Sequence, residues 1–176
     1  MTQSALARLP LSVEHTTFVD RRGPLAEARA LLGKTRLLTV SGPGGVGKSR
    51  FTLQLVNAVR RLFDDQVWFF DLSSVRTGGS VADHVATKLG LQSASRDQVG
   101  EIAAYFGQGR GLVVLDSCEH GIDLAAELVR KILAECPGIS IIATSQAVFR
   151  MSAEVVFPLG PLLMPDDRTP LEASAV

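Results

Sequence analysis

Residues 36–49 read Arg-Leu-Leu-Thr-Val-Ser-Gly-Pro-Gly-Gly-Val-Gly-Lys-Ser, and this stretch decides the fold. Its first part is a short apolar and β-branched run, which is typical of a strand buried on both faces. Its second part, residues 42–49, matches the pattern G-x-x-x-x-G-K-S/T in full. Apolar residues then recur at the spacing of one helix face, at positions 51, 55, 56, 59, 62 and 63. A strand, a glycine-rich loop and a helix in this order predict a phosphate-binding loop.

The residue types of this loop suit the phosphates of a nucleotide such as ATP or ADP. Glycines adopt backbone angles that other residues avoid, so successive amide groups can turn inward around an anion. The following helix adds free N–H groups and its positive dipole end. Lys48 is predicted to reach the β- and γ-phosphates, and the Ser49 hydroxyl to bind Mg²⁺. The predicted nucleotide-binding residues of this segment are Gly42, Pro43, Gly44, Gly45, Val46, Gly47, Lys48, Ser49 and Arg50.

A second signal is the apolar run at 112–115, which ends in Asp116. An Asp at the carboxyl end of a buried strand is how a P-loop protein places a carboxylate beside Mg²⁺, so Asp116 is predicted to be a Mg²⁺ partner, through water. Glu119 is the nearby carboxylate that could act as a base in hydrolysis, although a solvated Glu in a loop is the alternative. Cys118 is expected to be packed rather than reactive, and His120 to be structural or solvent-facing.

The alternation of strand and helix continues along the chain. Further strands are predicted at 67–70, 112–115, 140–144 and 155–157, and further helices at 25–32, 81–89, 98–106 and 124–133. Near-continuous apolar strands that alternate with helices argue for a parallel sheet covered on both faces. The predicted fold is an α/β three-layer αβα domain with a parallel sheet of about five strands.

Length and composition predict one domain and exclude several classes of function. The chain has 176 residues, of which 46% are hydrophobic, enough for one core. Its 18 basic and 18 acidic residues cancel, which disfavours direct nucleic-acid binding by this segment. No stretch is apolar enough to span a bilayer and no signal peptide is visible, so a cytoplasmic protein is expected. The two cysteines lack metal-ligand spacing and are expected to be reduced thiols.

Three segments are predicted from the change in composition along the chain. Residues 1–17 form a leader without firm periodicity, and residues 18–162 form the P-loop domain. Residues 163–176 are rich in proline and turn-forming residues, as in a linker to a domain that is absent.

Four stretches of the chain resemble the STAND class of signal-transduction ATPases. They are Phe-Val-Asp-Arg at 18–21, the glycine-rich loop, Leu-Val-Val-Leu-Asp-Ser-Cys-Glu-His at 112–120, and Cys-Pro-Gly-Ile-Ser-Ile-Ile-Ala-Thr-Ser at 136–145. The chain is most similar to the NB-ARC-like domain of bacterial transcriptional regulators of the AfsR and large LuxR types. The resemblance implies a switch that holds ADP or ATP, with Val19 and Arg21 near the adenine. It also implies transcriptional output through a DNA-binding domain outside this chain.

The chain departs from the family pattern at several positions. Gln146 stands where the family has an Arg that senses the γ-phosphate, and a neutral amide supplies no charge there. Arg150 is an alternative source of that charge. Asp20 and Arg22 also replace the family's usual Gly and Glu. The predicted function is therefore an ATP/ADP-binding switch with slow or absent hydrolysis. The alternatives are a turnover ATPase with Glu119 as base, a small-molecule kinase, and an interaction module that binds no nucleotide.

Overall fold

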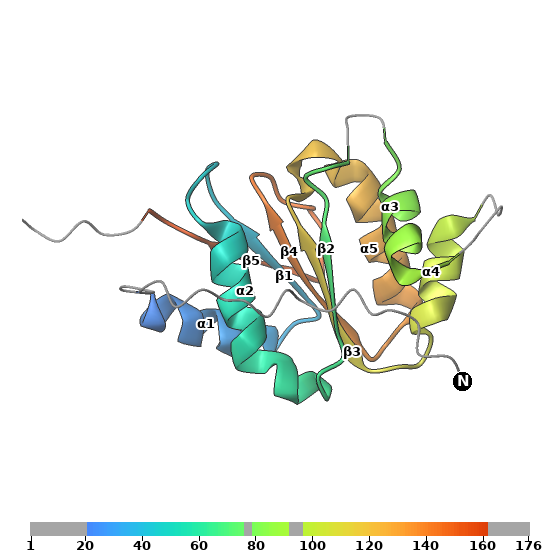
Figure 1. The fold of residues 1–176 in the computed structure, drawn as a ribbon. Helices are drawn as coiled ribbons and strands as arrows, with labels where there is room; N and C mark the ends of the chain where they lie inside the picture. The colour runs from blue at the N-terminus through green and yellow to red at the C-terminus, as the bar shows by residue number, and fades with distance from the viewer. Residues whose placement is uncertain (1–20, 76–78, 92–96, 162–176) are drawn as a thin grey trace, which may run out of the picture.

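The computed structural model describes residues 21–75, 79–91 and 97–161. These residues form a parallel sheet of five strands between two layers of helices (Figure 1), as the sequence predicts. In chain order the elements are α1 (Arg22–Leu32), β1 (Leu37–Ser41), α2 (Lys48–Val59), η1 (Arg60–Phe63), β2 (Val67–Asp71), α3 (Val81–Leu89), α4 (Gln98–Phe106), β3 (Gly111–Asp116), η2 (Cys118–His120), α5 (Ile122–Glu135), β4 (Ile139–Ser145) and β5 (Glu154–Pro158).

The strands lie in the order β2-β3-β4-β1-β5, and each neighbouring pair is parallel. Ser41, the last residue of β1, is in register with Ser145 of β4 and with Pro158 of β5. The carboxyl ends of the strands therefore meet along one edge of the sheet. Loops that leave this edge carry residues from distant parts of the sequence into one place.

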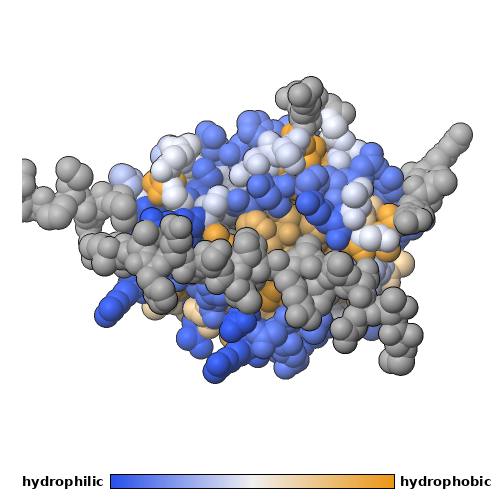
Figure 2. Space-filling model, in the orientation of Figure 1, coloured by the Kyte–Doolittle hydropathy of each residue, from blue (hydrophilic) through white to orange (hydrophobic). Residues whose placement is uncertain are grey.

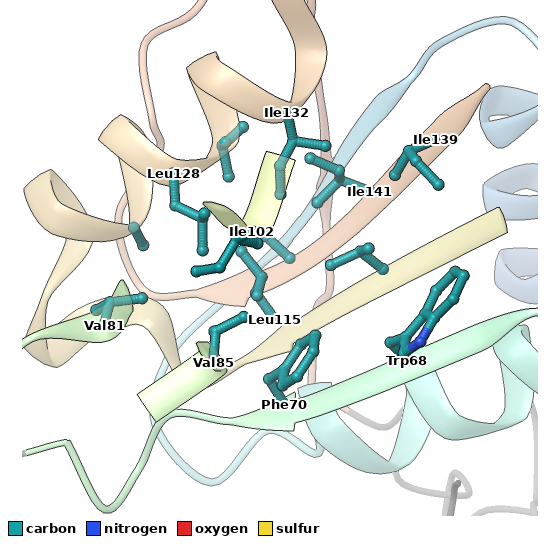
Figure 3. Close-up of a cluster of buried hydrophobic side chains, with 14 of the residues drawn as sticks. Trp68, Phe70, Val81, Val85, Ile102, Leu115, Leu128, Ile132, Ile139 and Ile141 are labelled. Atoms are coloured by element: carbon teal, nitrogen blue, oxygen red, sulfur yellow. The ribbon is translucent and has the colours of Figure 1, made fainter. Parts of the chain in front are cut away.

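Two separate cores cover the two faces of the sheet. One contains Leu38 and Val40 of β1 and lies under α1 and α2, where Phe51 stacks on Phe157 at a centroid distance of 5.4 Å. The other contains Leu37 of β1 and lies under α3, α4 and α5. Because successive strand residues point to opposite faces, one short apolar run supplies both cores. Figure 3 shows the second core, in which side chains from the helices and the sheet point toward one another.

The predicted apolar faces of two helices are wrong in detail. Leu62 was expected on the buried face of the helix after the loop, yet its side chain is 52% exposed. The α-helix ends at Val59 and the chain continues as the 3₁₀ turn η1, which has three residues per turn. This change of period turns Leu62 outward while Phe63 stays buried. Leu124, in the first turn of α5, is also exposed.

The first helix begins earlier than expected. It starts at Arg22 rather than after Pro24, so that Pro24 lies inside the first turn. The first N–H groups of a helix have no partner within it, so a proline there removes no hydrogen bond.

The surface of the domain is mainly polar where Figure 2 shows it in colour, with smaller apolar areas between the hydrophilic residues. Within the described residues, no helix is both long and apolar enough to cross a membrane.

Candidate functional site

The glycine-rich loop joins the carboxyl end of β1 to the amino end of α2, as predicted (Figure 1). At the carboxyl edge of the sheet, β1 continues into α2 on one face, and β3, on the other side of β4, continues through η2 into α5 on the opposite face. In open α/β sheets, a crevice forms at the carboxyl edge where chain segments leave toward opposite faces, and ligands bind there. The loop thus lies at the position where this architecture holds a ligand.

The backbone of the loop uses the freedom of glycine at two positions. Gly45 has φ of 74° and Gly47 has φ of 90°, both in the left-handed region that other residues rarely adopt. Gly42 is required for a different reason, since a Cβ atom there would lie 2.6 Å from the main-chain oxygen of Leu159. The loop therefore packs directly against the chain that leaves β5.

Lys48 begins α2 and points back across the loop. Its side chain is a buried cation, and its Nζ donates to the main-chain oxygens of Gly42 at 2.9 Å and Pro43 at 3.1 Å. An ammonium group is a compact charge with three donors, which phosphate oxygens accept as readily as carbonyls do. Ser49 follows in the first turn of α2, and Arg50 next to it is exposed.

Asp116 ends β3 and is held by the neighbouring strand. The Thr144 hydroxyl of β4 donates to Asp116 Oδ1 at 2.5 Å and accepts a hydrogen bond from the Ser117 amide at 2.8 Å. Leu115 is in register with Ala143, which places the next residues of β3 and β4 side by side. Ser117 has φ of 63°, so the chain turns sharply after the carboxylate. Sequence reasoning missed Thr144, because its partner lies 28 residues away.

The residues after Asp116 form the short 3₁₀ turn η2. Cys118 is buried and donates to the main-chain oxygen of Leu115 at 3.4 Å. Burial raises the pKa of its thiol strongly, and the carboxylates of Asp116 and Glu119 raise it further. A thiol that stays protonated is not a nucleophile, which fits the structural role predicted for Cys118. His120 is exposed.

Glu119 has one carboxylate oxygen in an unusual environment. Its Oε2 is buried and has no hydrogen-bond partner among the described residues. A buried carboxylate oxygen without a donor is costly, so a donor from outside the described residues is expected at this atom.

Arg21 contacts the loop from the segment before α1. Its guanidinium donates to the main-chain oxygen of Val46 at 2.9 Å and to that of Gly160 at 3.3 Å. The family resemblance pointed to Arg21 in the sequence, but it did not predict that Arg21 binds these two main-chain oxygens. Val19, its predicted companion near the adenine, lies outside the described residues.

Gln146 follows β4 and lies next to the loop. A Cβ atom on Gly44 would be 3.6 Å from Gln146 Nε2, so the neutral amide of Gln146 lies beside the glycine-rich loop. Arg150 is exposed and has φ of 57° in the turn between β4 and β5. The site thus combines the glycine-rich loop after β1, the buried ammonium of Lys48 and the buried carboxylate of Asp116 at the end of β3. This combination suits a polyphosphate with a bound Mg²⁺.

Comparison with known proteins agrees with this geometry. The model of the NB-ARC domain family matches residues 26–147 of the chain. A Mycobacterium tuberculosis protein named "Putative HTH-type transcriptional regulator" is 36% identical over 146 residues, covering 82% of this chain and 16% of that protein. A second M. tuberculosis protein, named "Uncharacterized protein", is 32% identical over 164 residues, covering 89% of this chain and 42% of that protein. The chain thus spans less than half the length of these relatives.

Solved structures show the same fold. A STAND protein with a tetratricopeptide repeat sensor from Pyrococcus horikoshii aligns with a TM-score of 0.60 at 13% identity, over 90% of this chain and 25% of that chain. The Pif1 helicase from Candida albicans aligns with a TM-score of 0.50 at 14% identity, over 81% of this chain and 40% of that chain. These likenesses concern the fold alone. With a family model that matches most of its length, the chain belongs to the NB-ARC domain family of nucleotide-binding domains.

Proposed function

We propose that this chain is the ADP/ATP-binding switch domain of a longer, cytoplasmic transcriptional regulator. The observation that carries the proposal is the complete glycine-rich loop between β1 and α2, with Lys48 at its end and Asp116 on the same edge of the sheet. The name of the M. tuberculosis relative supports the regulatory context. In this proposal residues 18–162 form the nucleotide-binding unit, residues 1–17 a leader, and residues 163–176 a linker to further domains.

Each site residue has a defined task in this proposal. The loop amides surround the β-phosphate, and Lys48 exchanges its bonds with the Gly42 and Pro43 carbonyls for bonds to phosphate oxygens. Ser49 and Asp116 hold Mg²⁺, which screens the charge of the phosphates. The bound nucleotide changes how neighbouring domains pack. DNA contacts belong to another domain, since this segment carries no net charge.

Slow hydrolysis is part of the proposal. Charge develops on the γ-phosphate oxygens during phosphoryl transfer, and an arginine stabilises it strongly. Gln146 lies near Gly44 but contributes only a neutral donor. A switch benefits from this, because a long-lived triphosphate state gives the partner domains time to respond.

Nucleotide binding by the Lys48→Ala variant tests the proposal. Loss of a charge-assisted contact of ~1.5–3 kcal/mol is expected to weaken ADP binding in the presence of Mg²⁺ by about 10- to 100-fold. Isothermal titration calorimetry with Mg²⁺ and ADP measures this. Lys34→Ala is the matched control, because it removes the same charge from an exposed position before β1, at the opposite edge of the sheet. Absence of binding by the wild type would favour the interaction module.

A turnover ATPase is the second candidate. It is favoured by Glu119, whose Oε2 is buried and has no hydrogen-bond partner among the described residues. Such an oxygen accepts a hydrogen bond from an attacking water if Glu119 is the base. In this case Glu119→Gln would lower steady-state phosphate release at least about 100-fold while ADP affinity stays unchanged. Equal rates near background in both proteins would reject the turnover ATPase and support the switch. Conversion of ATP to ADP that requires an added acceptor molecule, without release of inorganic phosphate, would instead indicate a kinase.

A further inference from the structure

Among the described residues Arg21, like Lys48, is a buried cation, with 7% of its surface exposed. Buried arginines are rare unless their donors are satisfied. Its Nη2 atom donates to two main-chain oxygens, those of Val46 and Gly160, which are 25 and 139 residues away in sequence. We call this arrangement, Arg21 with the carbonyls of Val46 and Gly160, the Arg21 clasp.

The first half of the clasp fixes the orientation of a peptide in the phosphate loop. The peptide bond is planar and trans, so the C=O of Val46 and the N–H of Gly47 point in opposite directions. A guanidinium that holds the Val46 carbonyl on one side therefore aims the Gly47 N–H to the other. Gly47 has φ of 90°, and a Cβ atom there would lie 3.6 Å from Arg21 Nη1. Arg21 thus sets the direction of a loop amide without needing to touch the nucleotide.

The second half of the clasp holds the chain where it leaves β5. The Leu159 amide donates to the Ser41 oxygen at 2.7 Å, immediately before the loop. The Leu159 oxygen lies so close to Gly42 that only a glycine fits there. Gly160, the next residue, accepts the second bond from Arg21. The outgoing chain therefore lies against the start of the loop and is fastened to its middle.

We propose that Arg21 is a positioning residue that couples the conformation of the phosphate loop to the chain that leaves β5 at Leu159 and Gly160. The proposal rests on the proposed function, in which nucleotide occupancy sets the conformation of the loop. When the Val46–Gly47 peptide is fixed by a phosphate, the carbonyl at 46 stays on Arg21, and the guanidinium is held in place for Gly160. Occupancy of the loop is thereby transmitted to the start of the segment that leads out of this domain.

The geometry explains why arginine is needed at this position. Nη2 holds both carbonyls through its two N–H groups, whose directions are fixed by the planar guanidinium. A lysine ammonium, such as that of Lys48, can also hold two carbonyls, but it is a compact point charge on a flexible stem and does not fix their directions. Both acceptors are main-chain atoms, so the side chains at positions 46 and 160 do not contribute to the clasp.

Amide hydrogen exchange of the whole chain, with and without saturating Mg²⁺-ADP, tests the coupling. In the wild type, binding is expected to slow exchange of the loop amides at 44–49 and of the Leu159 and Gly160 amides by about tenfold or more. In Arg21→Ala at saturating nucleotide, the loop amides are still slowed, but exchange at Leu159 and Gly160 is the same with and without nucleotide. Arg22→Ala, which removes the same charge from the exposed neighbouring position, is expected to match the wild type.

Arg21→Lys provides a second measurement that does not depend on how well the alanine variant folds. It keeps the charge, and the expected result is protection of the loop with a reduced response at Leu159 and Gly160. A full response at these two amides in both Arg21 variants would overturn the proposed coupling but would leave the proposed function intact. Loop amides in the wild type that do not slow with Mg²⁺-ADP would overturn the proposed function, and the coupling with it.

Discussion

A single threonine hydroxyl joins two strands at the carboxyl edge of the sheet. Thr144 donates to Asp116 and accepts from the amide of Ser117, so it fixes both the carboxylate and the turn that follows. The carboxylate of Asp116 is buried, and a buried carboxylate needs such donors to remain in a defined orientation. Thr144 thus orients the carboxylate that we propose as a Mg²⁺ ligand.

Replacement of this hydroxyl gives a prediction at the scale of one residue. Thr144→Val keeps the shape of the side chain but leaves the Ser117 amide and Asp116 without their partner. Each unsatisfied buried group costs about 1–3 kcal/mol, so the midpoint of urea unfolding is expected to fall. The enhancement of ADP affinity by Mg²⁺, measured by calorimetry with and without the ion, is expected to shrink as well. Thr144→Ser retains the hydroxyl and should behave as the wild type, and a valine variant with unchanged Mg²⁺ dependence would contradict this role.

At the scale of whole elements, Arg36 fastens the end of α5 to the sheet. Its guanidinium lies just before β1 and donates to the main-chain oxygens of Leu133, Cys136 and Ile139. The last carbonyls of a helix have no partner within it and carry partial negative charge, which a cation satisfies well. One side chain therefore closes α5, the turn after it and the start of β4.

Arg36→Met tests this closure because it keeps the apolar stem and removes all three donors. We expect a loss of ~2 kcal/mol in the free energy of unfolding, since bonds to a charged donor are worth more than neutral ones. For a domain of this size the melting temperature should fall by roughly 4–8 °C. Lys34→Met, at an exposed position two residues earlier, is the control and should change the melting temperature little. Equal melting of the two variants would show that the end of α5 does not depend on Arg36.

At the scale of the whole molecule, we expect His84 to make the stability of the fold depend on pH. Burial lowers the pKa of this imidazole below its usual value of 6.5, and the positive charge of Lys88 lowers it further. Asp71 opposes the shift through its carboxylate and its backbone. Nε2 of His84 is buried and has no hydrogen-bond partner within the described part of the chain. The folded state therefore prefers the neutral imidazole.

The sign of the effect on folding follows from this preference. Below pH of about 6.5 the unfolded chain binds a proton at His84 that the folded chain resists, so stability falls as the pH decreases through the lowered pKa. Above pH 6.5 the imidazole is neutral in both states, and its contribution is constant. The melting temperature can be measured at pH 7.5 and at pH 5, which lie about one unit above and one to two units below the usual pKa of histidine. The difference between the two temperatures is expected to be smaller for His84→Asn than for the wild type. An equal difference in both proteins would exclude this role of His84.

The sequence by itself determined the elements and the phosphate loop. Strands and helices produce local sequence patterns with a period of two or of 3.6 residues. Residues 42–49 are contiguous, so Lys48 and Ser49 can be identified from the sequence without knowledge of distant contacts. Asp116 was predicted for the same reason, because it directly ends an apolar run. Leu62 was misplaced because a periodic pattern does not show where an α-helix tightens into a 3₁₀ turn.

Only the tertiary structure decided which strands are neighbours and which polar groups meet. The order β2-β3-β4-β1-β5 separates β1 from β2 and β4 from β5, and it depends on how two helical layers bury both faces of the sheet. The contact of Thr144 with Asp116 follows from this order, as do the two carbonyls held by Arg21. A hydrogen bond across many residues leaves no local pattern, since its geometry exists only after the core has packed.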